Sequence, residues 1–321
     1  MTSATLDWAD IQARARRNEP LARYTTARIG GPADLLIEVR STAELIAVAQ
    51  RAVERDIPFV VIGSGANILV SDRGVRGLVI LNRARSAHFE VRNARARVEV
   101  DSGVLLMTLA RDCIERGIAG MEWAISVPGT VGGAVVGNAG AHGTDMAACV
   151  QMVRVLRRDG IAEYWTPRQL QFGYRTSALK RYLPHERPIV LSATLELKLD
   201  SRVNLERRAN EHVAYRKATQ PPGASIGSMF KNPPGDYAGR LIEACGLKGK
   251  RIGGAMISEK HANFFVNASG DAKARDVKAL IDLARRAVFE RFGVLLELEV
   301  ELIGDWGDDQ PQLQANIVEV K

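Results

Sequence analysis

Two features are scarce in the 321-residue sequence: cysteine and long apolar runs. The three cysteines are too few and too scattered for a disulfide framework or a zinc site; they are Cys113, Cys149 and Cys245. No stretch approaches the roughly 18 consecutive apolar residues that a membrane span needs. The N-terminal segment is polar, bears arginines and lacks the apolar core of a secretory signal. We therefore expect a cytoplasmic protein with free thiols and no membrane partner.

The charge balance is basic, with 44 Lys and Arg against 37 Asp and Glu and a net charge of +7. A basic chain of this length fits either a nucleic-acid-binding protein or an enzyme with anionic ligands. A nucleic-acid interface would gather Lys and Arg on one face with interleaved aromatics. Here the basic residues are dispersed, with local pairs such as Arg157 and Arg158. We therefore expect no nucleic-acid partner.

The chain is long enough for two or three domains at 100 to 200 residues each. Helical and strand patterns occur together along it, which indicates the α+β class. We expect an N-terminal arm over 1–20, units over 21–82, 83–203 and 204–304, and a polar tail over 305–321. Apolar runs predict strands at 33–39, 59–62, 78–81, 98–100, 150–156 and 189–199, and helical spacing predicts helices at 45–53, 105–115 and 277–292.

The ends of the predicted helices carry recognisable signals. Ser41 and Glu44 have the spacing of a capping box at the first helix. Asp271 is expected to cap the last helix, and Gly293 to end it. Residues 294–303 then alternate, which predicts a strand with three glutamates, Glu297, Glu299 and Glu301, on one solvated face.

The first glycine-rich loop follows the strand at 59–62 and contains Gly63, Ser64, Gly65, Ala66 and Asn67. It lacks the third glycine of a dinucleotide-binding fingerprint, and a β run follows where that motif requires a helix. Successive N–H groups of small residues can still form an anion-binding nest for a phosphate. The same glycines also fit a tight β turn, so the loop by itself leaves both interpretations open.

The second glycine-rich segment, residues 126–143, has six glycines and almost no charge. A solvated loop would be more polar, and a core element would contain fewer glycines. Small residues packed against a flat, bulky ligand explain both features. We therefore interpret this segment as part of a ligand site, and its candidate residues are Pro128, Gly129, Thr130, Gly132, Gly133, Asn138 and Gly140.

Several polar residues are candidates for chemistry. Ser228 lies between Gly227 and Lys231 without a Gly-x-Ser-x-Gly elbow, so it fits a proton donor or an ordinary loop hydroxyl better than a nucleophile. Arg175 follows an aromatic residue, which suits a substrate carboxylate or phosphate but also a surface ion pair. The five histidines show no metal-ligand spacing, and we expect no metal site.

Taken together, these segments resemble the UDP-N-acetylenolpyruvoylglucosamine reductase family from about residue 24 to 304. The resemblance begins with the segment from Tyr24 to Ala33 and continues through both glycine-rich loops. Any one of these motifs is a weak signal, but their ordered set is specific. The later motifs are Phe172-Gly173-Tyr174-Arg175, Gly227-Ser228-Met229-Phe230-Lys231-Asn232-Pro233, the segments 238–249 and 257–267, and Leu296-Glu297-Leu298-Glu299-Val300.

The resemblance implies a two-subdomain FAD-binding fold of the vanillyl-alcohol-oxidase (PCMH-type) kind over 21–82 and 83–203. It also implies a C-terminal α+β substrate-binding domain over 204–304. FAD would be bound without a covalent link, NADPH would be the co-substrate, and the enolpyruvyl group of a nucleotide sugar would be reduced. We expect a monomer whose partner is this small-molecule substrate.

The resemblance also implies roles for individual residues. Ser228 would be the general acid, and Arg175 and Glu299 would stabilise the carboxylate end of the intermediate. Both glycine-rich loops would bind FAD. Tyr174, Lys231 and Asn232 would contact the substrate. A guanidinium beside that carboxylate acts where negative charge develops.

The sequence departs from the family pattern at three places. Ile226 follows Ser225 before the Gly227-Ser228 pair, and His142 replaces the usual aromatic. The segment from Thr176 to Pro188 is short, which indicates the subclass without an insertion. An FAD-dependent oxidase of the same fold is an alternative; it would need a covalent flavin attachment, for which His142 and Cys149 are the nearby candidates.

Overall fold

The computed structural model describes residues 6–307 of the chain and confirms the α+β class. The first unit is a four-stranded sheet in the order β1-β2-β5-β3, in which β5 pairs in parallel with both β2 and β3. Its strands are β1 (Arg16–Pro20), β2 (Pro32–Val39), β3 (Phe59–Ile62) and β5 (Val75–Asn82). Its helices are α1 (Trp8–Arg14), η1 (Leu21–Tyr24) and α2 (Thr42–Val53).

The predicted arm contributes regular structure to this unit. α1 and β1 lie within residues 1–20, and β1 pairs antiparallel with β2. At α2 the Ser41 hydroxyl accepts a hydrogen bond from the Glu44 N–H, as predicted, whereas the Glu44 carboxylate accepts from the N–H of Arg40. The buried face of α2 packs on the sheet because its apolar residues recur at helical spacing.

The second unit is an antiparallel sheet in the order β12-β11-β13-β7-β6, with β8 beside β13. Its buried residues form one core together with α3, α4 and the fully packed Trp123. The strands are β6 (Ala87–Arg92), β7 (Arg95–Asp101), β8 (Ile118–Ala119), β11 (Val150–Leu156), β12 (Ala162–Trp165) and β13 (Ile189–Leu199). The helices are α3 (Leu106–Glu115), η2 (Glu122–Ala124), α4 (Val131–Gly137), η3 (Met146–Ala148), α5 (Pro167–Leu170) and η4 (Ala178–Arg181), and a small hairpin joins β9 (Gly140–Ala141) to β10 (Thr144–Asp145).

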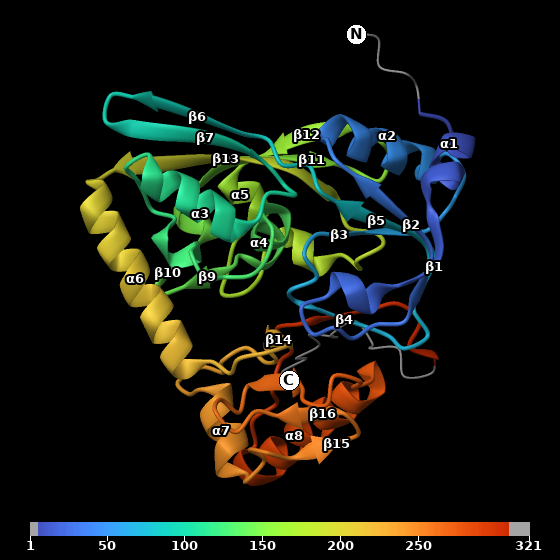
Figure 1. Ribbon diagram of the computed structural model, residues 1–321, viewed down its shortest axis with the longest axis vertical. Coiled ribbons are helices and arrows are strands. Elements are labelled where there is room, and N and C mark those ends of the chain that lie inside the picture. The colour runs from blue at the N-terminus through green and yellow to red at the C-terminus, as the bar shows by residue number, and fades with distance from the viewer. Residues whose placement is uncertain (1–5, 308–321) are drawn as a thin grey trace, which may run out of the picture.

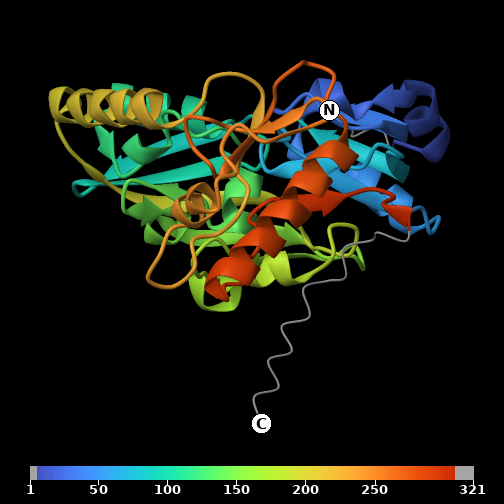
Figure 2. The same ribbon diagram turned by 90° about the horizontal axis from the view of Figure 1, so that it is seen from below.

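The C-terminal unit lies below the other two in Figure 1, and the long helix α6 (Arg202–Thr219) connects the second unit to it. Its sheet has the order β14-β17-β16-β15, and α8 lies across it when seen from below (Figure 2). Three apolar residues from the first unit, Ala27, Ile29 and Leu69, pack into its core. The elements are β14 (Ser225–Ser228), α7 (Ala238–Ala244), β15 (Arg251–Ile252), β16 (Ala255–Ile257), β17 (Phe264–Asn267) and α8 (Ala274–Phe292).

The end of the chain returns to the first unit. β18 (Glu301–Ile303) pairs in parallel with β4 (Ile68–Val70), with Glu301 opposite Ile68. This pairing puts residues 299–303 directly beside the first glycine-rich loop. The C-terminal unit is therefore tied to the first unit by a shared core and by this strand pair.

The strand predicted over 294–303 is wrong for most of its length, because only Glu301 to Ile303 form a strand. Before it, the backbone bonds to the loop after Ser228: Lys231 N–H donates to the Glu297 carbonyl, and Glu299 N–H donates to the Met229 carbonyl. The predicted solvated face holds for Glu297, whose side chain is 45% exposed, but is wrong for the other two glutamates. The side chains of Glu299 and Glu301 are each only 18% exposed, since both face the interior between the units.

The start of the last helix also differs from the prediction. α8 begins at Ala274 rather than after Asp271, and Lys273 is its N-cap residue. The Asp276 carboxylate accepts from the backbone N–H of Lys273 and thus satisfies a free donor of the first turn. Gly293 ends the helix in the left-handed conformation, at φ 66°, as predicted.

Candidate functional site

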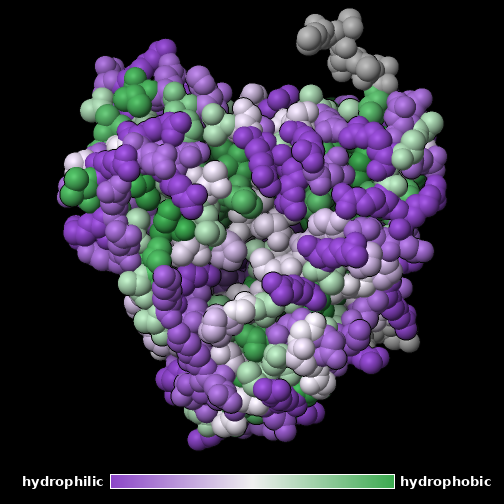
Figure 3. Space-filling model, viewed as in Figure 1, coloured by the Kyte–Doolittle hydropathy of each residue, from purple (hydrophilic) through white to green (hydrophobic). Residues whose placement is uncertain are grey.

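A cavity of about 360 Å³ lies where the three units meet. Its wall contains both glycine-rich loops, part of the segment 180–190, β14 and residues from 299 to 303. This volume is typical of small-molecule sites. Figure 3 shows residues of near-neutral hydropathy at the centre of one face, between the upper units and the C-terminal unit, with hydrophilic residues around them.

The first glycine-rich loop forms one wall because no larger residue fits its two glycine positions. A Cβ on Gly63 would collide with the Thr130 side chain, and one on Gly65, at φ 64°, would collide with the Tyr24 carbonyl. Ser64 has a buried hydroxyl without a hydrogen-bond partner within residues 6–307. In the same range, the backbone N–H groups of Ser64, Gly65 and Ala66 donate to no acceptor. These free donors fit the predicted anion nest.

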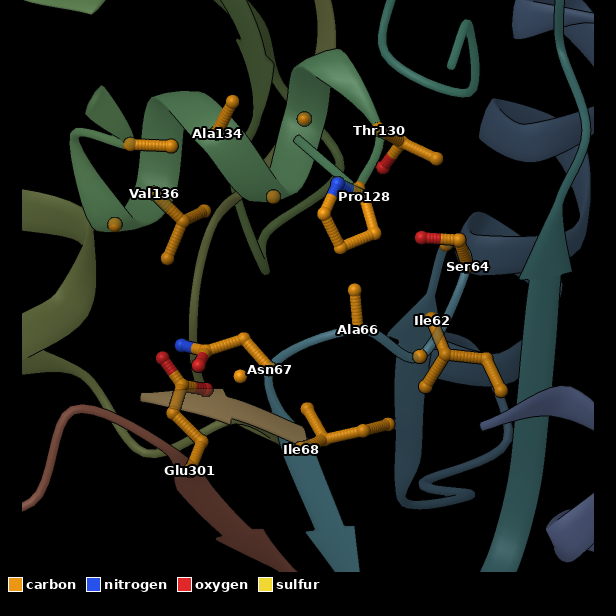
Figure 4. Close-up of a pocket in the computed structure, with 18 of the residues that line it drawn as sticks. Ile62, Ser64, Ala66, Asn67, Ile68, Pro128, Thr130, Ala134, Val136 and Glu301 are labelled. Atoms are coloured by element: carbon orange, nitrogen blue, oxygen red, sulfur yellow. The ribbon is translucent and has the colours of Figure 1, made fainter. Parts of the chain in front are cut away.

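The second glycine-rich loop lies opposite the first (Figure 4). Pro128 and Thr130 approach Ser64 from the chain that leads into α4, and Ala134 and Val136 project from α4 itself. All the predicted residues of both loops line the cavity except one. The exception is Asn138, which is only 2% exposed and bonds to Asp145, to the Gly173 carbonyl and to the Ala147 N–H. Asn138 therefore holds the loop in place through these hydrogen bonds and does not line the cavity.

Arg175 and Glu299 form an ion pair in the cavity wall. Arg175 Nε lies 3.0 Å from Glu299 Oε1, and its Nη2 donates to the Gly140 carbonyl at 2.6 Å. Arg175 has a left-handed backbone, at φ 56°, which is uncommon outside glycine and is held here by these contacts. The structure thus joins the second glycine-rich loop, the Tyr-Arg motif and the C-terminal segment at one point.

The electrostatics of Glu299 are dominated by burial. Burial raises the pKa of its carboxyl group above the usual value, although Arg175, Lys180 and Lys231 each act to lower it. The cost of removing the charged carboxylate from water raises the pKa more than the three cations together lower it. Glu299 therefore accepts a proton more readily than an exposed glutamate does.

Ser228 lies at the end of β14 and also lines the cavity. Gly227 before it has a left-handed φ of 89° and open space around it, so the chain turns there without strain. The loop after Ser228 is clamped by Asn263, whose side chain accepts from Phe230 N–H at 2.9 Å and donates to the Phe230 carbonyl at 2.8 Å. Asn263 is 3% exposed, and sequence reasoning did not single it out.

Three predicted substrate contacts lie outside the cavity wall. Tyr174 is 55% exposed, and its hydroxyl accepts from the Asn232 N–H at 3.5 Å. The Asn232 side chain accepts from Ala238 N–H and so holds the loop before α7. Lys231 forms an ion pair with Glu297. The structure joins Tyr174 to Asn232 but places none of the three in the lining of the cavity.

Several charged residues of the cavity wall were missed from the sequence. Arg187 binds the Glu301 carboxylate through both terminal nitrogens, at 3.0 and 3.2 Å, and Lys180 donates to the Glu299 carbonyl at 2.8 Å. Figure 4 shows Glu301 beside Asn67. The alternation that put Glu301 on the face of Glu299 was a usable signal for it. The short segment 176–188 gave no comparable signal for Lys180 and Arg187.

His142 and Cys149 are absent from the lining of this cavity. The His142 ring stacks on His212 of α6, with ring centroids 3.9 Å apart. Cys149 is buried, which raises the pKa of its thiol to about 12 and leaves it unreactive.

Within residues 6–307, no three His, Cys, Asp or Glu side chains are grouped so that they could hold a metal ion. In the same part of the chain, no helix combines the length and the apolar character that crossing a membrane requires.

Comparisons with known proteins match this architecture. The C-terminal domain family of UDP-N-acetylenolpyruvoylglucosamine reductase matches residues 218–303, and the FAD binding domain family matches residues 33–163. The chain is 47% identical over 297 residues to UDP-N-acetylenolpyruvoylglucosamine reductase 2 of Symbiobacterium thermophilum, which covers 92% of each chain. It is 41% identical over 288 residues to the reductase of Bacillus subtilis, with 89% of this chain and 93% of that one covered.

A solved structure agrees with these matches. The crystal structure of the reductase from Thermus caldophilus has a TM-score of 0.75 and 39% sequence identity, and covers 90% of this chain and 98% of that one. The predicted arrangement is confirmed: an FAD-binding domain is followed by the C-terminal domain of this reductase family. The chain belongs to the UDP-N-acetylenolpyruvoylglucosamine reductase family of FAD-binding oxidoreductases.

Proposed function

We propose that this chain uses NADPH and FAD to reduce the enolpyruvyl group of UDP-N-acetylglucosamine enolpyruvate to UDP-N-acetylmuramate, a peptidoglycan precursor. The observation that carries the proposal is one cavity whose wall contains both glycine-rich loops together with Ser228, Arg175 and Glu299. We further propose that the protein acts in the cytoplasm as a monomer, without nucleic-acid or membrane partners.

The residues of both loops fit FAD. Among the described residues, the Ser64 hydroxyl and the N–H groups around it have no partner, which suits the pyrophosphate. The small residues Gly129, Gly132 and Gly133 leave room for a flat ring system. FAD, when bound, supplies hydride transfer between the nicotinamide and the substrate, which no side chain can do. The burial of Cys149 and the stacking of His142 on His212 favour a non-covalent complex over the covalent oxidase alternative.

Side chains of the protein then donate the proton to the substrate and stabilise the negative charge that develops on it. The reaction adds a hydride and a proton across the carbon–carbon double bond next to a carboxylate, and NADPH becomes NADP⁺. Ser228 donates the proton to the substrate carbon. Arg175 holds the substrate carboxylate as negative charge develops on it. Glu299 stabilises the same end together with Arg175. Burial raises the pKa of its carboxyl group, and in the protonated form this group would donate a hydrogen bond to the substrate.

Three polar residues outside the cavity lining complete the binding of the nucleotide sugar. Tyr174, which bonds to Asn232, and Lys231 would contact the substrate outside the reacting group. Arg216 at the end of α6 lines the cavity and supplies a further cation for the diphosphate.

The proposal is tested by two measurements on the purified protein. Loaded with FAD, it should show a flavin absorbance spectrum that NADPH bleaches under anaerobic conditions. The enolpyruvyl substrate should then restore the oxidised spectrum faster than buffer alone does. A preparation that stays colourless with added FAD contradicts the flavin assignment, and reoxidation that the substrate does not accelerate contradicts the reductase assignment.

A further inference from the structure

Lys180 is a half-buried cation in the cavity wall that the proposed reaction does not use. It lies in η4, in the short segment after the Tyr-Arg motif, and lines the cavity together with Glu299. Its Nζ donates one hydrogen bond within residues 6–307, to the backbone carbonyl of Glu299 at 2.8 Å. An ammonium group has three donors. Removing it from water costs free energy unless these donors and its charge find partners.

The Glu299 carbonyl is a meeting point of three segments. It accepts the hydrogen bond from Lys180 and a second one, at 3.1 Å, from the side-chain amide of Asn67 in the first glycine-rich loop. The Glu299 N–H donates to the Met229 carbonyl, directly after Ser228. Both backbone groups of Glu299 are therefore anchored, so its side chain leaves the backbone in a fixed direction toward Arg175.

The charges around Lys180 make it an electrostatic neighbour of the same carboxyl group. Glu301, Lys231, Glu299 and Arg187 are the charged groups that act on it, and burial lowers its pKa from the ordinary value. In turn, Lys180 is one of the three cations that lower the pKa of Glu299 against the effect of burial. Loss of the Lys180 charge would therefore raise the pKa of Glu299 further.

We propose that Lys180 is a positioning residue for the reductase reaction: it holds the Glu299 backbone through the carbonyl oxygen and so directs the Glu299 carboxyl group to Arg175 and the substrate. Lys180 acts through Glu299 and not on the substrate itself. The inference rests on the proposed function, because it assigns Glu299 a part in the reaction.

The test compares Lys180→Met, which removes the charge and the donors at similar volume, with Lys180→Arg, which keeps both. Lys248→Met is the matched control, since Lys248 pairs with Glu243 on the surface. In Lys180→Met we expect reduction of FAD by NADPH within about twofold of the wild type. Reoxidation by the enolpyruvyl substrate should be slowed about tenfold through kcat, with KM changed less than twofold. Lys180→Arg should recover most of the rate.

The pH profile separates positioning from a general loss of structure. If protonated Glu299 is needed, reoxidation falls as the pH rises through its pKa, and this limb should move to higher pH in Lys180→Met. A titration of ¹³C-labelled glutamate carboxyls by NMR in the FAD-free protein gives an independent reading, with Glu299→Gln to assign the signal. The Glu299 signal should titrate at higher pH in Lys180→Met than in the wild type or in Lys248→Met.

Two outcomes overturn the inference. One is an unchanged reoxidation rate and an unchanged Glu299 titration in Lys180→Met. The other is an equal loss in both half-reactions accompanied by FAD release, which a merely structural lysine would produce. Failure of the proposed function is distinguished at once, because the wild-type protein itself would then not be reoxidised by the substrate, whereas the NMR titration would still report on Lys180 and Glu299.

Discussion

The Arg175 guanidinium lies 3.0 Å from the Glu299 carboxylate and also donates to the Gly140 carbonyl of the second glycine-rich loop. One side chain thus connects the predicted flavin loop to a residue near the end of the C-terminal unit. Because the backbone of Arg175 is left-handed and both its partners are fixed, little reorganisation is needed to hold an anionic substrate there. This arrangement supports specific predictions about the residues around it.

Ser228→Ala should separate the two half-reactions. The substitution removes the proposed proton donor but leaves both glycine-rich loops intact, so reduction of FAD by NADPH should stay within about twofold of the wild type. Reoxidation by the enolpyruvyl substrate should slow about 10²- to 10⁴-fold, the range typical of general acid catalysis. Anaerobic stopped-flow absorbance measures both rates. An equal loss in both would show that Ser228 supports the structure instead.

Glu299→Gln should not lower the thermal stability of the protein at neutral pH. Burial raises the pKa of Glu299 in the folded protein, so the folded state resists ionisation more than the unfolded state does. The cost to stability is absent at low pH and appears as the pH rises from the unfolded value of about 4.3 through the raised folded value. A neutral glutamine avoids this cost.

The measurement for Glu299→Gln is the melting temperature at pH 4 and pH 7.5. The variant should melt at or above the wild-type temperature at pH 7.5, and its relative advantage should shrink at pH 4. Glu243→Gln, which changes an exposed carboxylate paired with Lys248, is the control. A lower melting temperature of Glu299→Gln at pH 7.5 would mean that the ion pair with Arg175 outweighs burial.

Gly65→Ala should weaken FAD binding strongly. Gly65 has a left-handed φ of 64°, and an added Cβ would meet the Tyr24 carbonyl, so the loop must move away from its anion-binding shape. Gly270→Ala is the matched control, because Gly270 also has a left-handed φ, of 87°, but open space around it. Flavin fluorescence titration should show at least about tenfold weaker binding for Gly65→Ala only. Equal affinities in the two variants would refute the role of the close contact.

Asn263→Ala should destabilise the protein and loosen the loop after Ser228. It leaves the N–H and the carbonyl of Phe230 buried without their partners. Each such loss costs about 1–3 kcal/mol, so we expect unfolding free energy to fall by about 3 kcal/mol. Asn204→Ala on the exposed face of α6 should change it by less than about 0.5 kcal/mol. Urea unfolding monitored by circular dichroism measures both, and similar values for the two variants would contradict the clamp.

His142→Phe should reduce the sensitivity of stability to mild acid. Burial, His212 and Arg216 all lower the pKa of His142 in the folded protein, so the unfolded state takes up a proton more readily. This penalises the folded state as the pH falls below the unfolded value of about 6.5. The fall in melting temperature between pH 7.5 and pH 5.5 should therefore be smaller in the variant. A fall of the same size in both proteins would show that His142 does not contribute to the acid sensitivity.

Local patterns in the sequence determined much of this protein. The periodicity of apolar residues predicted most helices and strands. A helix or strand that buries one face needs apolar residues at a regular spacing, and this spacing can be read from the sequence. The glycines at 63, 65 and 132 were recognisable because close backbone approach requires residues without a side chain. The ordered motifs indicated the family, its cofactor and the set of Ser228, Arg175 and Glu299.

The tertiary structure decided the burial and the proton affinity of individual side chains, because these depend on long-range contacts. Alternation at 294–303 predicted a solvated glutamate face, but the pairing of β18 with β4 and the loop after Ser228 bury Glu299 and Glu301 instead. The same packing raises the pKa of Glu299 and brings Lys180 to its carbonyl. Burial and proton affinity depend on neighbours distant in sequence. The sequence therefore predicted the candidate catalytic residues, and only the fold set their positions and the proton affinity of Glu299.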